Sequence, residues 1–184
     1  MEQTNNPNLI KSTMTSGAIL AAALLIYTLI LYMTNLTFST PLGYVAYLIL
    51  IGGIIWGIKS FRDQEQNGFI NYGRALGVGM LTVAFASIIM AIFIYLLYSI
   101  IDPGLIQKGI ELARTKLVEK NLNEDQIEMA INMSKKFMTP AFLAIGTILG
   151  YGFLGLIFSL IIAAVMKNEG NTFPQTPLDS QQIS

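Results

Sequence analysis

The residues best able to act as acids or bases are gathered in one short stretch, residues 102–136. This stretch holds six acids and six bases: Asp102, Glu111, Glu119, Glu124, Asp125, Glu128, Lys108, Arg114, Lys116, Lys120, Lys135 and Lys136. Positioned carboxylates can take up and release protons in general acid–base catalysis. Here, however, acids cluster at the start of a predicted helix over 124–138 and lysines at its end, which is the order that the helix dipole favours. The pattern therefore favours a structural role over catalysis.

Two absent residue types exclude further chemistry. The sequence contains no cysteine, which excludes disulfides, thiolate nucleophiles and cysteine-held metal centres. It also contains no histidine, the commonest general base and metal ligand. We therefore predict no catalytic residue, no cofactor site and no metal site. The net charge of zero gives no indication of a nucleic-acid partner.

Long uncharged segments define the fold class. Charged residues make up only 12% of the chain, against a usual share of about 25%, and none occurs in residues 12–58, 75–101 or 137–166. A helix of 27 residues reaches about 40 Å, more than the roughly 30 Å hydrocarbon core of a bilayer. The first segment is long enough to cross twice. The sequence predicts an all-α integral membrane four-helix bundle with spans at 13–34, 41–58, 75–101 and 140–166.

The remaining segments are polar. We predict a polar N-tail at 1–12, an interfacial loop at 59–74, an extramembrane amphipathic helical hairpin at 102–139 and a disordered C-tail at 167–184. The interfacial loop interleaves aromatic and polar residues. It has two interpretations: a helix-turn that touches lipid head groups or a partner, or an ordinary loop whose aromatic residues lie in the interfacial belt.

The hairpin is predicted from signals at helix ends. Asp102 and Pro103 are suitable residues to begin a helix over 103–120, and Asn121 is suitable to end it. Asn123 and Gln126 match a capping box for the helix over 124–138. Apolar stripes on the two helices are expected to face each other or the bilayer surface; they consist of Ile106, Ile110, Leu117, Ile127, Ile131 and Met138.

Small residues and exposed methionines supply the interaction candidates. Gly73 and Gly77 have the spacing that lets two helix backbones approach closely, either within the bundle or in a homodimer. The same spacing recurs at Ala75/Gly79, Gly53/Gly57 and Gly146/Gly150. Met129 and Met133 fall outside the apolar stripe and offer an adaptable contact to a partner, to the bilayer or to a second subunit. The candidate interaction residues are Gly73, Arg74, Gly77, Ile110, Met129, Ile131 and Met133.

Several of these features together resemble a known bacterial family. They are the segment GFINYGRALGVG at 68–79, the long third span with its Asp102-Pro103 stop, the acidic-basic hairpin, and a last span ending in AAVMK. The chain is similar over residues 9–167 to the four-span membrane proteins of domain-of-unknown-function family 4199. The resemblance implies a bacterial integral membrane protein and implies no activity or catalytic residues.

Three functions from different classes are considered. The first is a non-enzymatic accessory or scaffold subunit of a membrane complex, bound through the hairpin and the small-residue faces. The alternative is a small-solute channel or transporter formed by a homo-oligomer, although the span interiors lack the ionisable groups that such pathways usually use. The third is a membrane enzyme acting on lipid-linked substrates. The expected partners are the lipid bilayer and either another membrane protein or further copies of the chain.

The expected location is the bacterial inner membrane, crossed several times, with both termini cytoplasmic. Basic residues at span ends are concentrated on the side of the termini, at Lys11, Lys59, Arg62, Arg74 and Lys167, and the 35–40 turn on the other side has none. The positive-inside rule therefore favours this orientation. Lys135 and Lys136 beside the fourth span argue for the opposite one.

Overall fold

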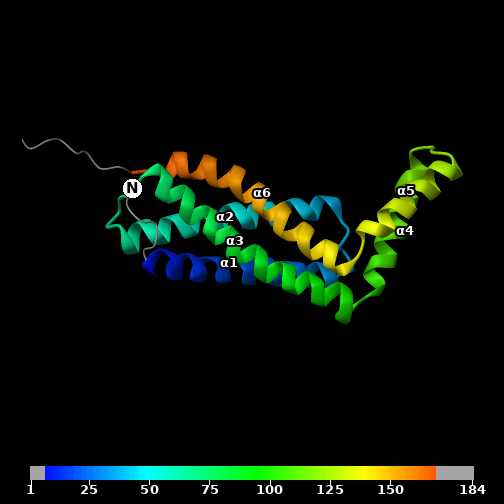
Figure 1. The fold of residues 1–184 in the computed structure, drawn as a ribbon, viewed down its shortest axis with the longest axis horizontal. Coiled ribbons are helices and arrows are strands. Elements are labelled where there is room, and N and C mark those ends of the chain that lie inside the picture. The colour runs from blue at the N-terminus through cyan, green and yellow to red at the C-terminus, as the bar shows by residue number, and fades with distance from the viewer. Residues whose placement is uncertain (1–6, 169–184) are drawn as a thin grey trace, which may run out of the picture.

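The computed structural model describes residues 7–168, and within them the chain is helical (Figure 1). The helices are α1 (Pro7–Met33), α2 (Thr40–Glu65), α3 (Tyr72–Leu96), α4 (Gly104–Glu119), α5 (Glu124–Phe137) and α6 (Pro140–Met166). A π-helical turn, Leu97–Ile101, extends α3. The described residues form no strand, and one isolated β-bridge joins Ile70 to Asn168. The predicted all-α fold class is confirmed.

Four helices are long and apolar enough to cross a membrane: Leu9–Met33, Thr40–Glu65, Tyr72–Ile101 and Pro140–Met166. They match the predicted spans in number and order. Two segments outside the predicted spans are partly helical. The predicted N-tail is helical from Pro7, and the predicted interfacial loop is helical through Glu65, which leaves residues 66–71 as the connection. Charged residues mark where a chain leaves hydrocarbon, but good helix formers such as Lys and Arg continue the helix beyond that point. Residues 1–6 of the N-tail and 169–184 of the C-tail lie outside the described residues.

Asparagines shape three of the turns. Asn35, Asn67 and Asn121 have φ angles of 57°, 50° and 55°, in the left-handed region that asparagine tolerates better than most residues. Asn121 therefore ends α4 in the predicted way. The predicted start of the last span at residue 140 matches the start of α6 at Pro140, which is capped by the Thr139 side chain: it accepts a hydrogen bond from the Phe142 backbone N–H at 3.3 Å.

The predicted cap of α4 is wrong. Pro103 occupies the N-cap position, and no side chain caps this helix. The Asp102 backbone N–H instead donates to the Leu97 carbonyl at 2.8 Å, which closes the π-helical turn. The Asp102 carboxylate lies 3.8 Å from Lys108 Nζ. The wider π turn therefore uses Asp102 to end α3, and its side chain reaches forward to α4 as an ion-pair partner.

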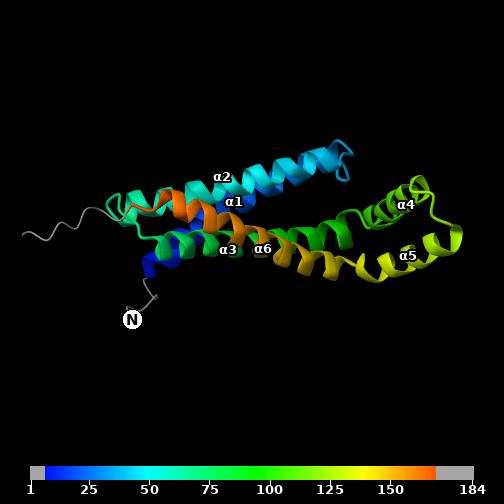
Figure 2. The same ribbon diagram turned by 90° about the horizontal axis from the view of Figure 1, so that it is seen from above.

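Glycines bring α3 and α6 close together. A Cβ on Gly79 would lie 2.6 Å from the Ser159 hydroxyl oxygen, and one on Gly155 would lie 2.6 Å from Val83 Cγ1. Both distances are shorter than a real carbon contact, so each site needs glycine. On the α2 side, a Cβ on Gly57 would lie 3.0 Å from Thr82 Oγ1. Figure 2 shows the spans running side by side, with α1 and α2 diverging from α3 and α6 towards one end.

The small-residue pairs do not all make contacts. Gly79, from the predicted pair Ala75/Gly79, is packed against α6, and Ala75 is fully buried. A Cβ on Gly77 would meet no atom within 4 Å, and one on Gly73 would meet only the local Asn71 side chain at 4.0 Å. The close helix contact predicted for Gly73 and Gly77 within the chain is therefore wrong. A homodimer contact at these residues stays a prediction.

The α2–α3 connection is fastened to the end of α6. The Ile70 backbone N–H donates to the Asn168 carbonyl at 2.9 Å, and the Asn168 N–H donates back to the Ile70 carbonyl at 2.8 Å. The Asn168 side chain also donates to the Gly68 carbonyl at 3.0 Å. These bonds hold the connection against the exit of the last span.

Candidate functional site

The α4–α5 pair is the largest part of the described chain that lies outside the four spans. It extends beyond the end of the bundle at which α3 ends and α6 begins (Figures 1 and 2). Its helices, Gly104–Glu119 and Glu124–Phe137, occur where the sequence predicts helices at 103–120 and 124–138.

The start of α5 is fixed by its own residues. The Asn123 side chain accepts a hydrogen bond from the Gln126 backbone N–H at 2.9 Å. In return, the Gln126 side chain accepts from the Asn123 N–H at 3.3 Å. This is the predicted capping box, which satisfies two backbone donors that the helix leaves open. Glu124 and Asp125 in the first turn and Lys135 and Lys136 in the last turn also complement the helix dipole.

An apolar cluster joins α4 to α5. Ile110 of α4 and Ile127 and Ile131 of α5 are buried together. Five partly buried residues pack around them: Ile106, Ala113, Leu117, Leu122 and Met138. Of the two orientations expected for the predicted stripes, the structure therefore has them facing each other. Isolated helices of 14 and 16 residues are marginal in water, so we expect the two helices to depend on this contact for their order.

The base of the pair is attached to the bundle. A Cβ on Gly109 would meet Met138 Cε at 3.1 Å and the ring of Phe38 at 3.3 Å. Phe38 belongs to the α1–α2 turn, so α4 packs directly on that turn. Phe137 and Phe142 form an edge-to-face contact with ring centroids 5.0 Å apart. These contacts restrict the angle at which the pair leaves the spans.

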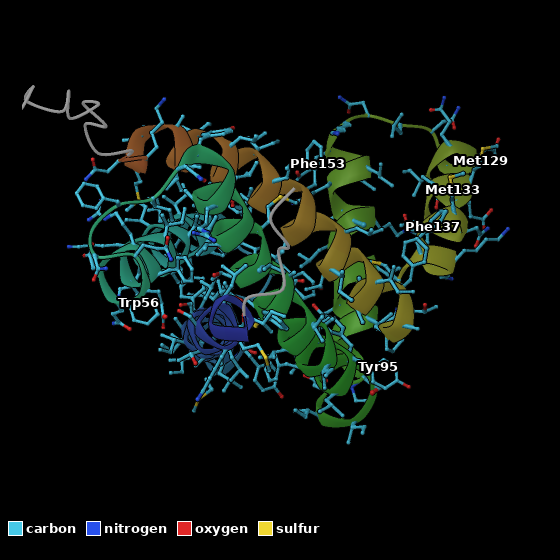
Figure 3. The ribbon with its side chains drawn as sticks, turned by 60° about the vertical axis from the view of Figure 1, so that its left-hand side comes forward. Trp56, Tyr95, Met129, Met133, Phe137 and Phe153 are labelled. Atoms are coloured by element: carbon cyan, nitrogen blue, oxygen red, sulfur yellow. The ribbon has the colours of Figure 1, made fainter. Side chains whose placement is uncertain are left out.

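The outer face of α5 carries an exposed apolar stripe. It consists of Met129, Met133 and Phe137, whose exposed fractions are 75%, 63% and 49%. The residues are spaced by four, so they lie along one face of the helix, and Figure 3 shows them following one another down α5. We call these three residues the methionine stripe. Phe137 was missed as a candidate, although its spacing from Met133 was visible in the sequence.

Charged side chains also lie on the surface of the α4–α5 pair. Arg114 of α4 pairs with Glu124 of α5, with both side chains more than half exposed. A surface ion pair of this kind contributes about 0–1 kcal/mol to the free energy of unfolding. Within residues 7–168, no group of three or more acidic side chains is placed to hold a metal ion.

The predicted interaction residues fall into two separate groups. Ile110 and Ile131 are buried between α4 and α5, while Met129 and Met133 are exposed on α5. Gly73, Arg74 and Gly77 belong to α3 near its start, at the other end of the bundle. The Arg74 side chain donates to Gln66 Oε1 at 2.8 Å, so it braces the α2–α3 connection.

A groove between α2 and α6 was also missed as a site. It has a volume of about 280 Å³ and is lined by Gly43, Ala46, Tyr47, Gly146, Thr147, Gly150, Tyr151 and Leu154. The Gly146/Gly150 pair therefore lines an open surface, because a Cβ on either glycine would meet no atom within 4 Å. The sequence shows the small residues, but not whether another helix covers them.

The four apolar helices and the separate helical pair define a multi-pass helical membrane protein. The chain belongs to a family described as a protein of unknown function, DUF4199, whose family model matches residues 15–168. This confirms the resemblance seen in the sequence. No curated protein and no solved structure matches the chain.

Proposed function

We propose that the protein is a non-enzymatic accessory or scaffold subunit of a bacterial inner-membrane complex, and that the α4–α5 pair binds the other component. The observation that carries this proposal is the methionine stripe. Met129 and Met133 are 75% and 63% exposed on a helix whose other apolar face is already buried against α4. On this proposal the pair is an amphipathic hairpin, and the stripe is an apolar surface that its own folding does not bury.

The chemistry of the stripe suits a protein partner. Methionine side chains are flexible and polarisable, and they adapt to irregular apolar surfaces. Anchors spaced by four along one helix are the pattern by which a helix is held in a groove. The contacts of Gly109 with Phe38 and Met138 hold the pair at a defined angle, which lowers the ordering cost of binding. The proposed partner is another membrane protein. No nucleic-acid partner is proposed.

The test compares two charge-changing substitutions in the full-length protein. Met133→Asp should abolish recovery of the partner from membranes in mild detergent, because it places a charge in the centre of the stripe. Glu119→Lys, an exposed charge reversal on α4, should leave recovery unchanged. A photo-crosslinking residue at position 133 should trap protein. If it traps lipid instead, the stripe faces the bilayer and the binding role is discarded.

The proposed orientation has both termini in the cytoplasm. Lys11, Lys59, Arg62, Arg74 and Lys167 all belong to the ends of α1, α2, α3 and α6 that meet at one end of the bundle. Because the chain lacks cysteine, single cysteines at the exposed residues Glu65 and Lys120 report each side. Lys120→Cys should react with an impermeant reagent from outside intact cells. Reaction of Glu65→Cys alone would show the opposite orientation.

The alternative function, a small-solute channel formed by a homo-oligomer, uses a different surface. The open groove of Gly43, Gly146, Thr147 and Gly150 between α2 and α6 is the feature that favours it, since a second copy packed there would bring small and hydroxyl side chains together. Solute flux through vesicles that contain only the purified protein tests this function. Flux that Gly146→Leu blocks would favour the channel over the scaffold.

A further inference from the structure

A polar pocket lies between the first turns of α1 and the last turns of α2, at the opposite end of the molecule from the α4–α5 pair. Its volume is about 370 Å³, within the range of small-molecule sites. Lys11, Ser12 and Thr15 line it from α1, and Ser60, Gln64 and Glu65 line it from α2. The two walls come from segments that lie far apart in the chain.

Lys11 and Glu65 carry opposite charges into this pocket, but they do not form an ion pair with each other. The ion pairs found within residues 7–168 join Arg62 to Asp63, Lys108 to Asp102 and Arg114 to Glu124. Neither Lys11 nor Glu65 takes part in them. Within the described residues, the pocket therefore holds a cation and an anion that are not paired with each other.

The pocket lies at the polar ends of the first two candidate spans. Lys11 follows the start of the first span, Leu9–Met33, by two residues, and Glu65 is the last residue of the second span, Thr40–Glu65. Trp56 lines the same pocket from deeper in the second span and is 43% exposed. Figure 3 shows it beside the beginning of α1. Tryptophan is enriched where head groups give way to acyl chains.

We propose that this pocket binds the head group of a phospholipid that carries a primary amine beside its phosphate, as in phosphatidylethanolamine. The phosphate lies against the Lys11 ammonium and the Ser12 and Ser60 hydroxyls, which donate hydrogen bonds to it. The lipid ammonium lies against the Glu65 carboxylate. The Thr15 hydroxyl donates to the Lys11 carbonyl at 3.1 Å, so its oxygen is free to accept from that ammonium.

The arrangement of charges selects this head group over others. An anionic head group without an amine meets Lys11 but is repelled by Glu65. A quaternary ammonium offers no N–H to the carboxylate, because only the primary amine has hydrogens to donate. The proposal is independent of the proposed partner binding, since none of its residues lies on α4 or α5.

The single tryptophan of the chain gives a direct measurement. The full-length protein is placed in phosphatidylcholine vesicles, and lipids with brominated acyl chains are added in increasing mole fraction to quench Trp56 fluorescence. Brominated phosphatidylethanolamine should quench at a lower mole fraction than brominated phosphatidylcholine or phosphatidylglycerol. Lys11→Gln and Glu65→Gln should each raise the mole fraction of brominated phosphatidylethanolamine that gives half-maximal quenching. The expected increase is about threefold to fivefold, as for the loss of an exposed charge pair.

The control is Lys59→Gln, which removes an exposed lysine at the same end of α2 that does not line the pocket. It should leave quenching unchanged. Equal quenching by the three lipids, or an effect of Lys59→Gln equal to that of Lys11→Gln, overturns the proposal. Preference for phosphatidylglycerol in the unmutated protein overturns the role of Glu65. If soluble glycerophosphoethanolamine shifts Trp56 fluorescence while the brominated lipid does not quench selectively, the ligand is water-soluble and the lipid assignment is overturned.

Discussion

The four spans and the α4–α5 pair are both packed helices of one chain, but different contacts hold them together. In the spans, glycines allow α3 and α6 to approach closely. Gly79 of α3 lies against Ser159 of α6, and Gly155 of α6 lies against Val83 of α3. In the pair, the large side chains of Ile110, Ile127 and Ile131 meet in one cluster. Lipid is as apolar as the helices it surrounds, so span packing depends on close backbone approach. In water, the removal of apolar surface from solvent is enough to hold two helices together.

Of the substitutions that test this comparison, Ile131→Asp should have the largest effect on stability. Ile131 is only 8% exposed, and a carboxylate there loses apolar burial and must be desolvated. The cost is on the order of 3 kcal/mol, which is more than a pair of short helices can bear. Hydrogen exchange on the solubilised protein should become rapid throughout α4 and α5, while the spans keep their protection.

Met133→Asp is the matched control for Ile131→Asp, because Met133 lies on the exposed face of the same helix. It should leave exchange in α4 and α5 unchanged. Slow exchange in both variants would mean that the isoleucine cluster does not hold the pair together.

Replacing Gly79 with leucine should have the next largest effect, and it acts on the spans. A Cβ alone would lie 2.6 Å from the Ser159 oxygen, so a leucine forces α3 away from α6. Overpacking of this kind costs about 1–3 kcal/mol. Thermal unfolding in detergent should show the loss for Gly79→Leu and little change for Gly77→Leu, since nothing lies near Gly77. Equal loss in both variants would contradict the close contact. An altered oligomer size for Gly77→Leu alone would indicate that Gly77 contacts a second chain.

Replacing Asn123 with alanine should have the smallest effect of the three. It removes the cap that accepts from the Gln126 backbone N–H, at a cost of about 1 kcal/mol. Exchange should accelerate mainly in the first turn of α5. Asn132→Ala, at an exposed interior position of the same helix, should be neutral or slightly stabilising, because alanine is the better helix former. A larger effect at Asn132 than at Asn123 would contradict the role of the cap.

Features encoded by adjacent residues could be predicted from the sequence. The capping box of Asn123 and Gln126, the left-handed Asn121 and the Thr139 cap each depend on a few neighbouring side chains. The spans could be predicted for the same reason, because a long uncharged helix has few environments available to it.

Features that depend on which helix faces contact each other could not be predicted from the sequence. The spacing of Gly73/Gly77 is the same as that of Ala75/Gly79, and only the position of α6 decides that Gly79 is the packed glycine. The continuation of α2 to Glu65 extends beyond the predicted end of the span at residue 58, because charged residues end a span without ending its helix. The π turn at Leu97–Ile101 has no marker in the sequence that we recognise, and it removed Asp102 from the predicted cap.

The pocket of Lys11 and Glu65 illustrates the same limit. Its residues come from two helices joined by a turn at the far end of the molecule, so no spacing along the chain brings them together. Lys11 and Lys59 both appear in the sequence as lysines at the end of a span. Only the packing of α1 on α2 shows that Lys11 lines a pocket and that Lys59 does not.

The pairing of Ile70 with Asn168 joins two residues that the ribosome makes at well-separated times. The side chain of Asn168 bonds to Gly68, 100 residues earlier in the chain. At translation rates of about 5–20 residues per second, roughly 5–20 seconds separate the two residues on the ribosome. Within that interval α3 (Tyr72–Leu96) is made before α6 (Pro140–Met166), the helix that covers Gly79. The small-residue face of α3 around Gly79 is therefore synthesised before the span that covers it.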